Sequence, residues 1–469
     1  MTDSLFEQVL SVEDTSEFLD FIIPDYGLLL WPYVRYSILA NCLERYFPKK
    51  YVFPSSVPAE GRLHRYGIFT KTILNFLRPW PKRLIWHYSA VGSAFYKLHN
   101  GRLYNIYTEP FAECLPNETL LLDASRGPEY IPTAVPYALR RVQPIRFFAG
   151  QITRFSPPAK YRILVDDFCA FVKERIQNVL GFSLAPDIMR VMAENLCHYT
   201  IPFVIAERRI FSFFLKKGRP RLLTIDDAFG GGYGHIILLA KEHGAIVAEH
   251  HHGHASKEHL AYSWANAMRT SATLARQLPD YFLTRGAYWH DKIRIPAQCR
   301  VLGHPWFAIQ AASQPARSGA GILFALATFY EDFTPIIQAI VQAFPARTVI
   351  VRPHPSEHDF FYASSAAKIP GIHIDTNNDI YDTFPVVDTV VGELSSSLFE
   401  AAALGKRVFS RISPRTKRIY TDTAFERYES AVELIEKLKQ PKPEISKKTQ
   451  DAIFDRNWKE NYINFFKDI

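Results

Sequence analysis

Residues 347–409 decide the fold. They read RTVIVRPHPSE (347–357), then DTVVGELSSS (388–397), then LFEAAALGKRVF (398–409). The first two runs each contain a stretch of β-branched residues and end in a polar turn. The third has helical spacing before another apolar strand. Short strands joined through helices are typical of parallel βα units, so the sequence predicts an α/β fold with a parallel sheet here.

Candidate binding residues follow these strands directly. Ligands of open α/β sheets bind beyond the carboxyl ends of the strands. The turn at Gly392 opens a helix whose free backbone N–H groups favour a phosphate, together with the hydroxyls of Ser395, Ser396 and Ser397. Glu400 lies in the first turns of that helix, within reach of a ribose hydroxyl. His354 is placed to donate a hydrogen bond to a leaving phosphate.

Other readings of the same residues stay open. The serine run is also what an ordinary Rossmann half with a serine N-cap would show. Arg352 can pair with a donor phosphate or carboxylate, or form a surface salt bridge with Glu357. Glu393 can hold ribose or cytosine, or simply belong to the turn.

The ordered set of motifs resembles the nucleotide-binding half of GT-B glycosyltransferases. The set is a strand followed by Arg-Pro-His-Pro (352–355), then Gly-x-x-Ser-Ser (392–396), then Glu-Ala-x-x-Leu-Gly-Lys (400–406). It is most similar to enzymes of bacterial surface polysaccharides, and the His-Pro and Ser-Ser pair resembles sialyl-, polysialyl- and Kdo-transferases that use CMP-activated sugars. CDP-polyol phosphotransferases of teichoic-acid type have a related layout. The resemblance covers about the last third of the chain. It implies two Rossmann-like domains facing across a cleft, with His354 and Pro355 in the nucleotide-sugar site.

The length of 469 residues predicts two or three domains. We expect a helical and amphipathic segment over residues 1–80 and a Rossmann-like acceptor domain over 81–312. A Rossmann-like nucleotide-sugar domain is expected over 320–445, followed by a closing helix over 446–469. In GT-B folds such a helix often crosses back to the first domain.

The acceptor domain carries an acidic pair after a predicted strand. Asp226 or Asp227 is the candidate general base, because the bacterial sialyltransferases have an acidic pair followed by glycine after a strand. In this chain two residues separate the pair from Gly230, so the match is imperfect. Helix capping or turn formation is the alternative role of the pair.

A histidine-rich turn follows the next strand. Glu249-x-x-His252-Gly253 is similar to an element of related polysaccharide transferases, in which His252 would contact the acceptor or the carboxylate of the donor sugar. Glu249, Gly253 and His254 are therefore expected on the acceptor side. Histidines that bond to loop carbonyls are one alternative, and a metal site is another. No convincing ligand set is complete and GT-B enzymes generally need no catalytic metal, so we expect neither metal nor cofactor.

Charge indicates the class of partner. The formal net charge is +8, which favours a nucleotide sugar, an acidic glycan or an anionic membrane surface. No basic run with interleaved aromatics predicts a nucleic-acid partner. Five scattered cysteines, an acidic start and no apolar stretch long enough to span a bilayer favour a cytoplasmic protein resting on the inner face of the membrane.

Two N-terminal stretches have alternative roles. The helix that begins near Trp31 and includes Arg35 is either a core helix capped by a buried aromatic, which we favour, or an acceptor or membrane-facing element. Residues 61–80 form a basic amphipathic stretch that suits either a membrane interface or a solvated helix face.

The sequence thus predicts a cytoplasmic GT-B transferase that moves a sugar, from a CMP-activated acidic donor, onto a cell-surface glycan or a lipid-linked glycan. The alternatives are a CDP-polyol phosphotransferase, a nucleotide-sugar epimerase on the same fold and a non-catalytic glycan-binding protein. Fold alone does not choose among them.

Overall fold

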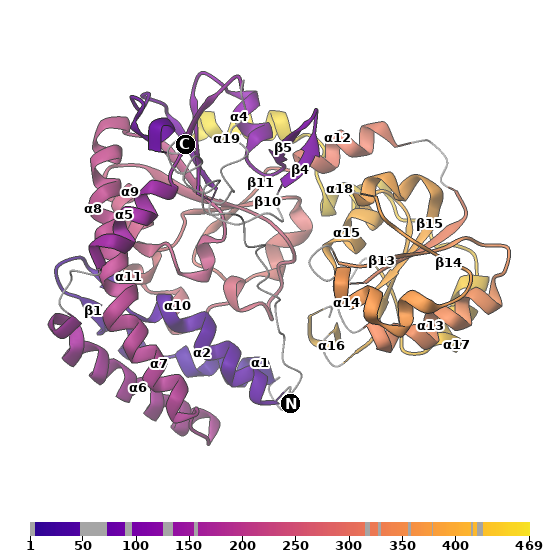
Figure 1. Ribbon diagram of the computed structural model, residues 1–469, viewed down its shortest axis with the longest axis horizontal. Coiled ribbons are helices and arrows are strands. Elements are labelled where there is room, and N and C mark those ends of the chain that lie inside the picture. The colour runs from indigo at the N-terminus through magenta and orange to yellow at the C-terminus, as the bar shows by residue number, and fades with distance from the viewer. Residues whose placement is uncertain are drawn as a thin grey trace.

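The computed structural model contains two parallel sheets in two units (Figure 1). It describes residues 5–46, 73–89, 96–124, 135–153, 158–314, 319–326, 330–354, 358–377, 379–413, 416–419 and 425–469. The predicted α/β class with two Rossmann-like units is confirmed.

The N-terminal unit is built on a seven-stranded sheet of order β7-β6-β3-β8-β9-β10-β11, parallel at each pair of neighbours. Numbered along the chain within this sheet, the order is 3-2-1-4-5-6-7, so the direction of winding reverses between β3 and β8. The strands are β3 (Ile85–Ser89), β6 (Thr119–Asp123), β7 (Ala138–Arg141), β8 (Leu222–Ile225), β9 (Ile246–His250), β10 (Tyr281–Thr284) and β11 (Gln298–Val301).

The C-terminal unit has the same kind of topology, in a six-stranded parallel sheet of order β14-β13-β12-β15-β16-β17. Its order along the chain is 3-2-1-4-5-6, the doubly wound arrangement whose ligands bind where the winding reverses. That point lies between β12 and β15. The strands are β12 (Gly321–Ala325), β13 (Val349–Arg352), β14 (Ile372–Ile374), β15 (Val387–Gly392), β16 (Arg407–Arg411) and β17 (Glu426–Tyr428), and the helices include α13 (Tyr330–Ala343), α14 (His358–Ala363), α15 (Ser396–Ala403), α16 (Thr416–Ile419) and α17 (Ala431–Lys439).

Helices cover both faces of the N-terminal sheet. On one face, Trp86 and Tyr88 of β3 pack with side chains of α8 (Ile201–Gly218) and α9 (Gly234–Glu242), and Ile145 of α5 (Gln143–Thr153) joins this core. On the other face, Ile85 packs with residues of α4 (Glu109–Cys114) and α19 (Trp458–Asp468). Alternating side chains of a buried strand point to opposite faces, so neighbouring positions of β3 serve two cores.

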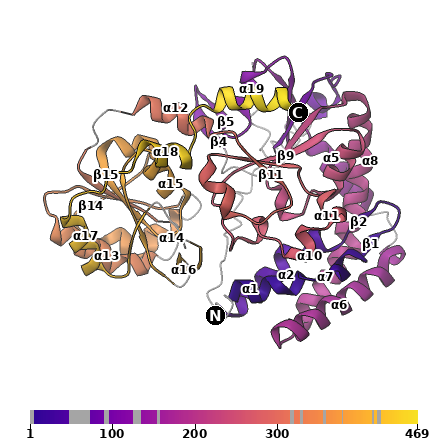
Figure 2. The same ribbon diagram turned by 180° about the vertical axis from the view of Figure 1, so that it is seen from behind.

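A helical layer lies beside this sheet and includes the N-terminus (Figures 1 and 2). Trp31 and Arg35 of α2 (Trp31–Tyr46) are fully buried, and both donate hydrogen bonds to the buried carboxylate of Glu13. The prediction of a core helix is therefore confirmed for these two residues, and the acceptor or membrane-facing alternative is wrong for them. The layer also contains α1 (Leu5–Leu10), the hairpin β1 (Ile22–Ile23) and β2 (Leu28–Leu29), α6 (Arg162–Leu180), α7 (Pro186–Asn195), α10 (Asn266–Arg269) and α11 (Ala272–Ala275).

The C-terminal segment crosses back from the second unit to the first. After α18 (Lys447–Ile453), α19 lies against the N-terminal sheet, where the hydroxyl of Tyr462 is 3.1 Å from Nε2 of the buried His87. The carbonyl of Ala452 occupies the space that a Cβ at position 286 would need, so Gly286 lets the crossing chain approach the end of β10. No helix in the described part of the chain combines the length and apolar composition needed to span a bilayer.

Candidate functional site

The two units meet at the carboxyl ends of their central strands. His254, which follows β9, stacks on Phe399 of α15 with ring centroids 5.6 Å apart. Trp289 of the N-terminal unit packs against the same ring at 4.7 Å. The loops that follow β9 and β10 therefore contact the helix that follows β15, which itself begins at the point where the winding of the second sheet reverses.

Arg285 is a buried cation at this meeting point. It follows β10 directly, and its guanidinium donates to the hydroxyl of Tyr107 at 2.8 Å and to the carbonyl of His251 at 3.3 Å. Among the described residues, no carboxylate forms an ion pair with it. A buried charge without a direct ion pair is costly, so Arg285 is poised to pair with an anionic ligand.

Four histidines lie near this guanidinium, of which His251 and His304 are buried and His252 and His254 are partly exposed. Desolvation is the first cause that lowers the pKa of each, and the charge of Arg285 is among the further causes. The pKa falls to about 4 for His252 and about 3 for His254, and well below the usual value for His251 and His304. These imidazoles are therefore neutral at pH 7. They add hydrogen-bonding groups to the site without adding positive charge.

A carboxyl group of the C-terminal unit faces the same guanidinium. Burial raises the pKa of Glu400 on α15, and the positive charge of Arg285 opposes the rise. Tyr381 lies next to Glu400, and burial followed by the negative charge of Glu400 raises the pKa of its phenol well above 10. Arg285, Glu400 and Tyr381 thus form one electrostatic group with contributions from both units.

Asp227 is the exposed acid of the N-terminal site. It adopts a left-handed conformation with φ of 56°, which is strained for a residue other than glycine. Partial burial raises its pKa to about 6, although 51% of its side chain remains exposed. An aspartate with this pKa is ionised at pH 7 and still accepts a proton readily.

His252 stands between two carboxyl groups. Its Nε2 is 3.9 Å from Oδ1 of Asp227, and its Nδ1 is 3.8 Å from Oε1 of Glu249. Glu249 is fully buried, accepts from the Phe229 amide at 2.7 Å and from the Tyr262 hydroxyl at 2.9 Å, and has a pKa raised well above its usual value by burial. The structure therefore brings Asp227, His252 and Glu249 together, with Glu249 inside the fold and only Asp227 open to an acceptor.

Asp226 differs from its neighbour in the sequence. Its side chain is buried beneath the turn, and its amide donates to the carbonyl of Tyr88 across the sheet. Gly253 adopts φ of 65°, which turns the chain between His252 and His254. Of the acidic pair, Asp227 alone is accessible to an acceptor.

The serine run of the C-terminal unit caps α15. The hydroxyl of Ser395 accepts from the Ser397 amide at 3.3 Å and lies 2.7 Å from the Ser397 hydroxyl, while Ser396 begins the helix. A Cβ at position 392 would lie 2.8 Å from the carbonyl of Ala325, so Gly392 allows β12 and β15 to stay close at this turn. The N-cap reading is correct. A capped helix still presents free N–H groups of its first turn to a ligand.

The remaining predicted residues lie apart from this turn or are already bonded. Arg352 pairs with the buried Asp375 at 2.7 Å, so its charge is largely compensated. Glu357, its predicted alternative partner, lies outside the described residues. Glu393 is buried behind the turn, where its carbonyl accepts from Ser410. His354 is exposed beyond the end of β13. Pro355 lies outside the described residues.

Arg285, Tyr107 and Tyr381 are site residues that the sequence did not single out. The available signal for Arg285 was its position, because it directly follows the run Tyr281-Phe-Leu-Thr284, whose aromatic and β-branched residues are typical of a strand. Tyr107 precedes α4 and Tyr381 follows β14, so neither carries a motif of its own. Contacts in the folded chain identify them, Tyr107 by its hydrogen bond with Arg285 and Tyr381 by its proximity to Glu400.

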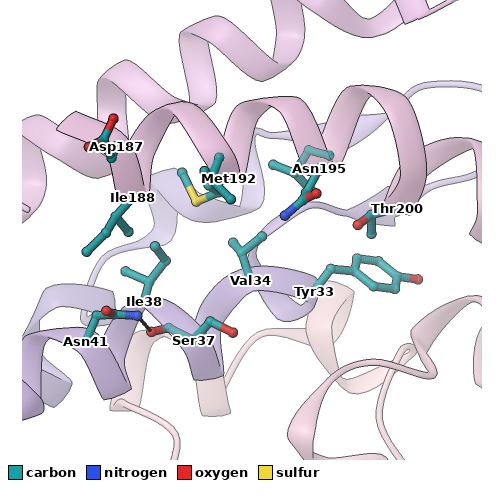
Figure 3. A pocket seen from close by; sticks show the side chains of 12 residues that line it. Tyr33, Val34, Ser37, Ile38, Asn41, Asp187, Ile188, Met192, Asn195 and Thr200 are labelled. Carbon is teal, nitrogen blue, oxygen red and sulfur yellow. Dashed lines mark hydrogen bonds between the residues drawn. The ribbon is translucent and has the colours of Figure 1, made fainter. Parts of the chain in front are cut away.

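A separate cavity of about 510 Å³ lies between α2 and α7 (Figure 3). Val34, Ile38, Ile188 and Met192 give it an apolar wall, and none of the residues around Arg285 lines it. The part of the chain that the structure describes contains no group of three or more His, Cys, Asp or Glu residues placed to hold a metal ion.

Comparison with known proteins gives distant likenesses in structure alone. No family model and no curated protein matches the sequence. UDP-GlcNAc 2-epimerase from Neisseria meningitidis is 8% identical, with a TM-score of 0.45 over 81% of this chain and 98% of its own. The Methanocaldococcus jannaschii UDP-GlcNAc 2-epimerase is 9% identical, with a TM-score of 0.44 over 82% and 100%. The wall teichoic acid polymerase TagF is 10% identical, with a TM-score of 0.40 over 87% and 93%. No substrate is carried over from proteins this distant.

Proposed function

We propose that the protein is a GT-B glycosyltransferase that moves a sugar from a nucleotide donor to a surface glycan or lipid-linked glycan. The donor we propose is a CMP-activated acidic sugar. One observation carries the proposal: the buried guanidinium of Arg285 has no carboxylate ion pair among the described residues and faces the helix that follows β15. A donor with phosphate and carboxylate groups supplies the missing negative charge.

In this proposal the C-terminal unit holds the nucleotide. Its phosphate lies at the turn from Gly392 to Ser396, where the first N–H groups of α15 point outward. Glu400 accepts a hydrogen bond from a ribose hydroxyl. Arg285 reaches the donor from the opposite unit, so both units must be present for full affinity.

Transfer then takes one displacement step. The acceptor hydroxyl gives its proton to the carboxylate of Asp227, and its oxygen forms a bond to the anomeric carbon. The bond between that carbon and the phosphate oxygen breaks, and the nucleotide leaves with the electron pair. Arg285 and His354 stabilise the charge that develops on the phosphate. His252 is a positioning residue that fixes the side chain of Asp227.

The experiment is product analysis with CMP-activated sugar and glycan acceptors, on the wild type, Asp227→Asn and Asp291→Asn. We expect a new glycosidic bond from the wild type and a rate about 10²–10⁴-fold lower from Asp227→Asn. Asp291→Asn is the matched control, because its side chain is 73% exposed, and it should retain wild-type turnover.

Other products overturn the proposal in distinct ways. A phosphodiester product identifies a CDP-polyol phosphotransferase, and an isomerised sugar nucleotide identifies an epimerase. Binding without turnover identifies a glycan-binding protein. Thermal-shift measurements with CMP, CDP, UDP, GDP and ADP test which nucleobase the protein binds, because a bound nucleotide stabilises the folded state. A preference for UDP or GDP would remove the CMP-sugar donor and leave the transfer reaction to be judged by its product.

A further inference from the structure

One face of the N-terminal unit combines exposed apolar side chains with basic ones. Three segments build it: residues 73–89, residues 138–153 with α5, and residues 208–221 in and after α8. None of the three contains Asp or Glu. Leu74, Leu77 and Phe213 are 61%, 67% and 54% exposed. Such side chains in one place indicate an interaction surface.

Aromatic packing joins the first and third segments into one surface. Trp80 stacks on Phe214 with ring centroids 4.0 Å apart, and Phe76 meets Phe214 edge-on at 5.3 Å. The helical turn 73–77 is therefore anchored on α8 through Phe76, which leaves Leu74 and Leu77 outside. Phe213, beside the anchoring ring, is exposed as well.

Basic side chains gather around these apolar groups. Lys217 lies over the ring of Phe213 at 4.1 Å, with the exposed Lys216 next to it. Arg140 of β7 donates to the carbonyl of Pro79 at 2.6 Å. Burial and the positive charge of Arg78 both lower the pKa of Arg140, so two cations sit close together here. Close cations in segments without acids favour an anionic partner.

The second segment also carries exposed apolar and basic side chains. On α5, which packs beside α8, Phe147, Phe148 and Ile152 are exposed, and Arg146 accompanies them. Both views place α5 and α8 at the end of the molecule far from the C-terminal unit (Figures 1 and 2). A partner on this face would leave the meeting point of the two units uncovered.

We propose that this face, defined by Leu74, Leu77, Phe213, Arg78, Lys216 and Lys217, docks the protein on an anionic lipid bilayer. Apolar side chains flanked by lysine and arginine enter the headgroup region while the cations meet anionic lipids. The described helices include none that spans a bilayer, so the contact is peripheral. This inference does not depend on the transfer reaction.

The test is co-sedimentation of the full chain with vesicles of phosphatidylcholine, with and without phosphatidylglycerol. We expect binding to the anionic vesicles that weakens as salt is added and is much weaker on phosphatidylcholine alone. Leu77→Glu with Lys217→Glu should lower binding about tenfold or more. The matched control is Val432→Glu with Lys448→Glu, which makes the same change of charge at exposed sites of the C-terminal unit and should bind like the wild type.

Separate variants guard against misfolding. Lys216→Ala with Lys217→Ala, and Phe213→Ser alone, change exposed side chains and should each weaken vesicle binding severalfold while nucleotide-induced stabilisation stays unchanged. No sedimentation of the wild type with anionic vesicles would overturn the proposal. Equal losses in the test and control pairs would do the same, as would binding to duplex DNA or an acidic protein with no binding to vesicles.

Discussion

Arg35 and Arg285 are both buried, but their surroundings differ. Arg35 donates to both carboxylate oxygens of Glu13, at 2.5 and 2.8 Å, and to the carbonyls of Leu260 and Ser263, and it lies over the ring of Trp264. Arg285 donates to one phenol and one carbonyl. The two arginines are alike in burial and differ in the counter-charge, which supports a structural role for Arg35 and the binding role that we propose for Arg285.

The comparison identifies what each region is built to do. Glu13 also accepts from the indole of Trp31 and the amide of Ala265, so the carboxylate that neutralises Arg35 is itself held by hydrogen bonds inside the fold. At Arg285 the nearby imidazoles are neutral and the carboxyl of Glu400 belongs to the other unit. The fold therefore places an arginine without a direct ion pair where the two parallel sheets present their carboxyl ends.

We expect the largest effect, a loss of stability, when the ion pair between Arg35 and Glu13 is broken. Glu13→Gln leaves Arg35 buried without a counter-charge, and the free energy of unfolding should fall by about 3–5 kcal/mol. Chemical denaturation measures this loss. Glu17→Gln, at an exposed position four residues away, should change stability by less than about 0.5 kcal/mol. Equal losses of unfolding free energy in Glu13→Gln and Glu17→Gln would show that the buried ion pair does not stabilise the fold more than an exposed carboxylate does.

Arg285→Met should mainly lower ligand affinity, whereas Glu13→Gln mainly lowers stability. We expect nucleotide-sugar affinity to fall by about 1.5–3 kcal/mol, roughly 10–100-fold, because a hydrogen-bonded charge on the ligand loses its partner. Stability should change less than in Glu13→Gln, since the two lost hydrogen bonds are offset by removal of a buried charge. Calorimetry on this variant and on Arg276→Met, the same change at an exposed site, measures both. Unchanged affinity in Arg285→Met would remove the anion-binding role.

Turnover should follow the protonation of Asp227. With a pKa of about 6, its carboxylate is mostly protonated at pH 5 and cannot take the acceptor proton, whereas at pH 7 it is mostly ionised. The rate should therefore rise roughly tenfold between these values. A pH profile of kcat/KM checks this. The residual rate of Asp227→Asn should show no such rise between pH 5 and pH 7. A half-rise near pH 4 would point to an unshifted carboxyl as the base.

The smallest effect concerns the cap of α15. Ser395→Ala should cost about 1 kcal/mol of stability, because the Ser397 amide loses its acceptor. Nucleotide affinity should also fall severalfold as the first turn loosens. Ser430 caps α17 in the same way by accepting from Glu433, so Ser430→Ala should lose similar stability and keep full affinity. An equal loss of nucleotide affinity in Ser395→Ala and Ser430→Ala would show that the serine turn is not part of the nucleotide site.

Much of the architecture was predictable from local patterns. The β-branched runs at 349–352 and 387–392 became strands of one parallel sheet, on either side of β12, and the serine run became a helix cap. The buried role of Trp31 and Arg35 followed from an apolar helix that begins at an aromatic residue. These features depend on residues close in the sequence, where period and cap chemistry are directly visible.

Pairing of charges was not predictable in the same way. Arg352 looked available for a phosphate, but Asp375, which follows β14, neutralises it. Asp226 and Asp227 looked equivalent, yet the strained turn buries one and exposes the other. Arg285 looked unremarkable until both units were in place. Each outcome depends on which side chains of distant strands share a sheet edge.

The sequence by itself determined the α/β class, the positions of the strands and the helix cap at Ser395, because these depend on periodicity and short-range hydrogen bonding. Only the tertiary structure decided which buried charge has a direct ion pair and which lies where the two units meet. The reason is physical: the energy of a buried charge depends on the atoms around it, and those atoms come from segments far apart in the chain.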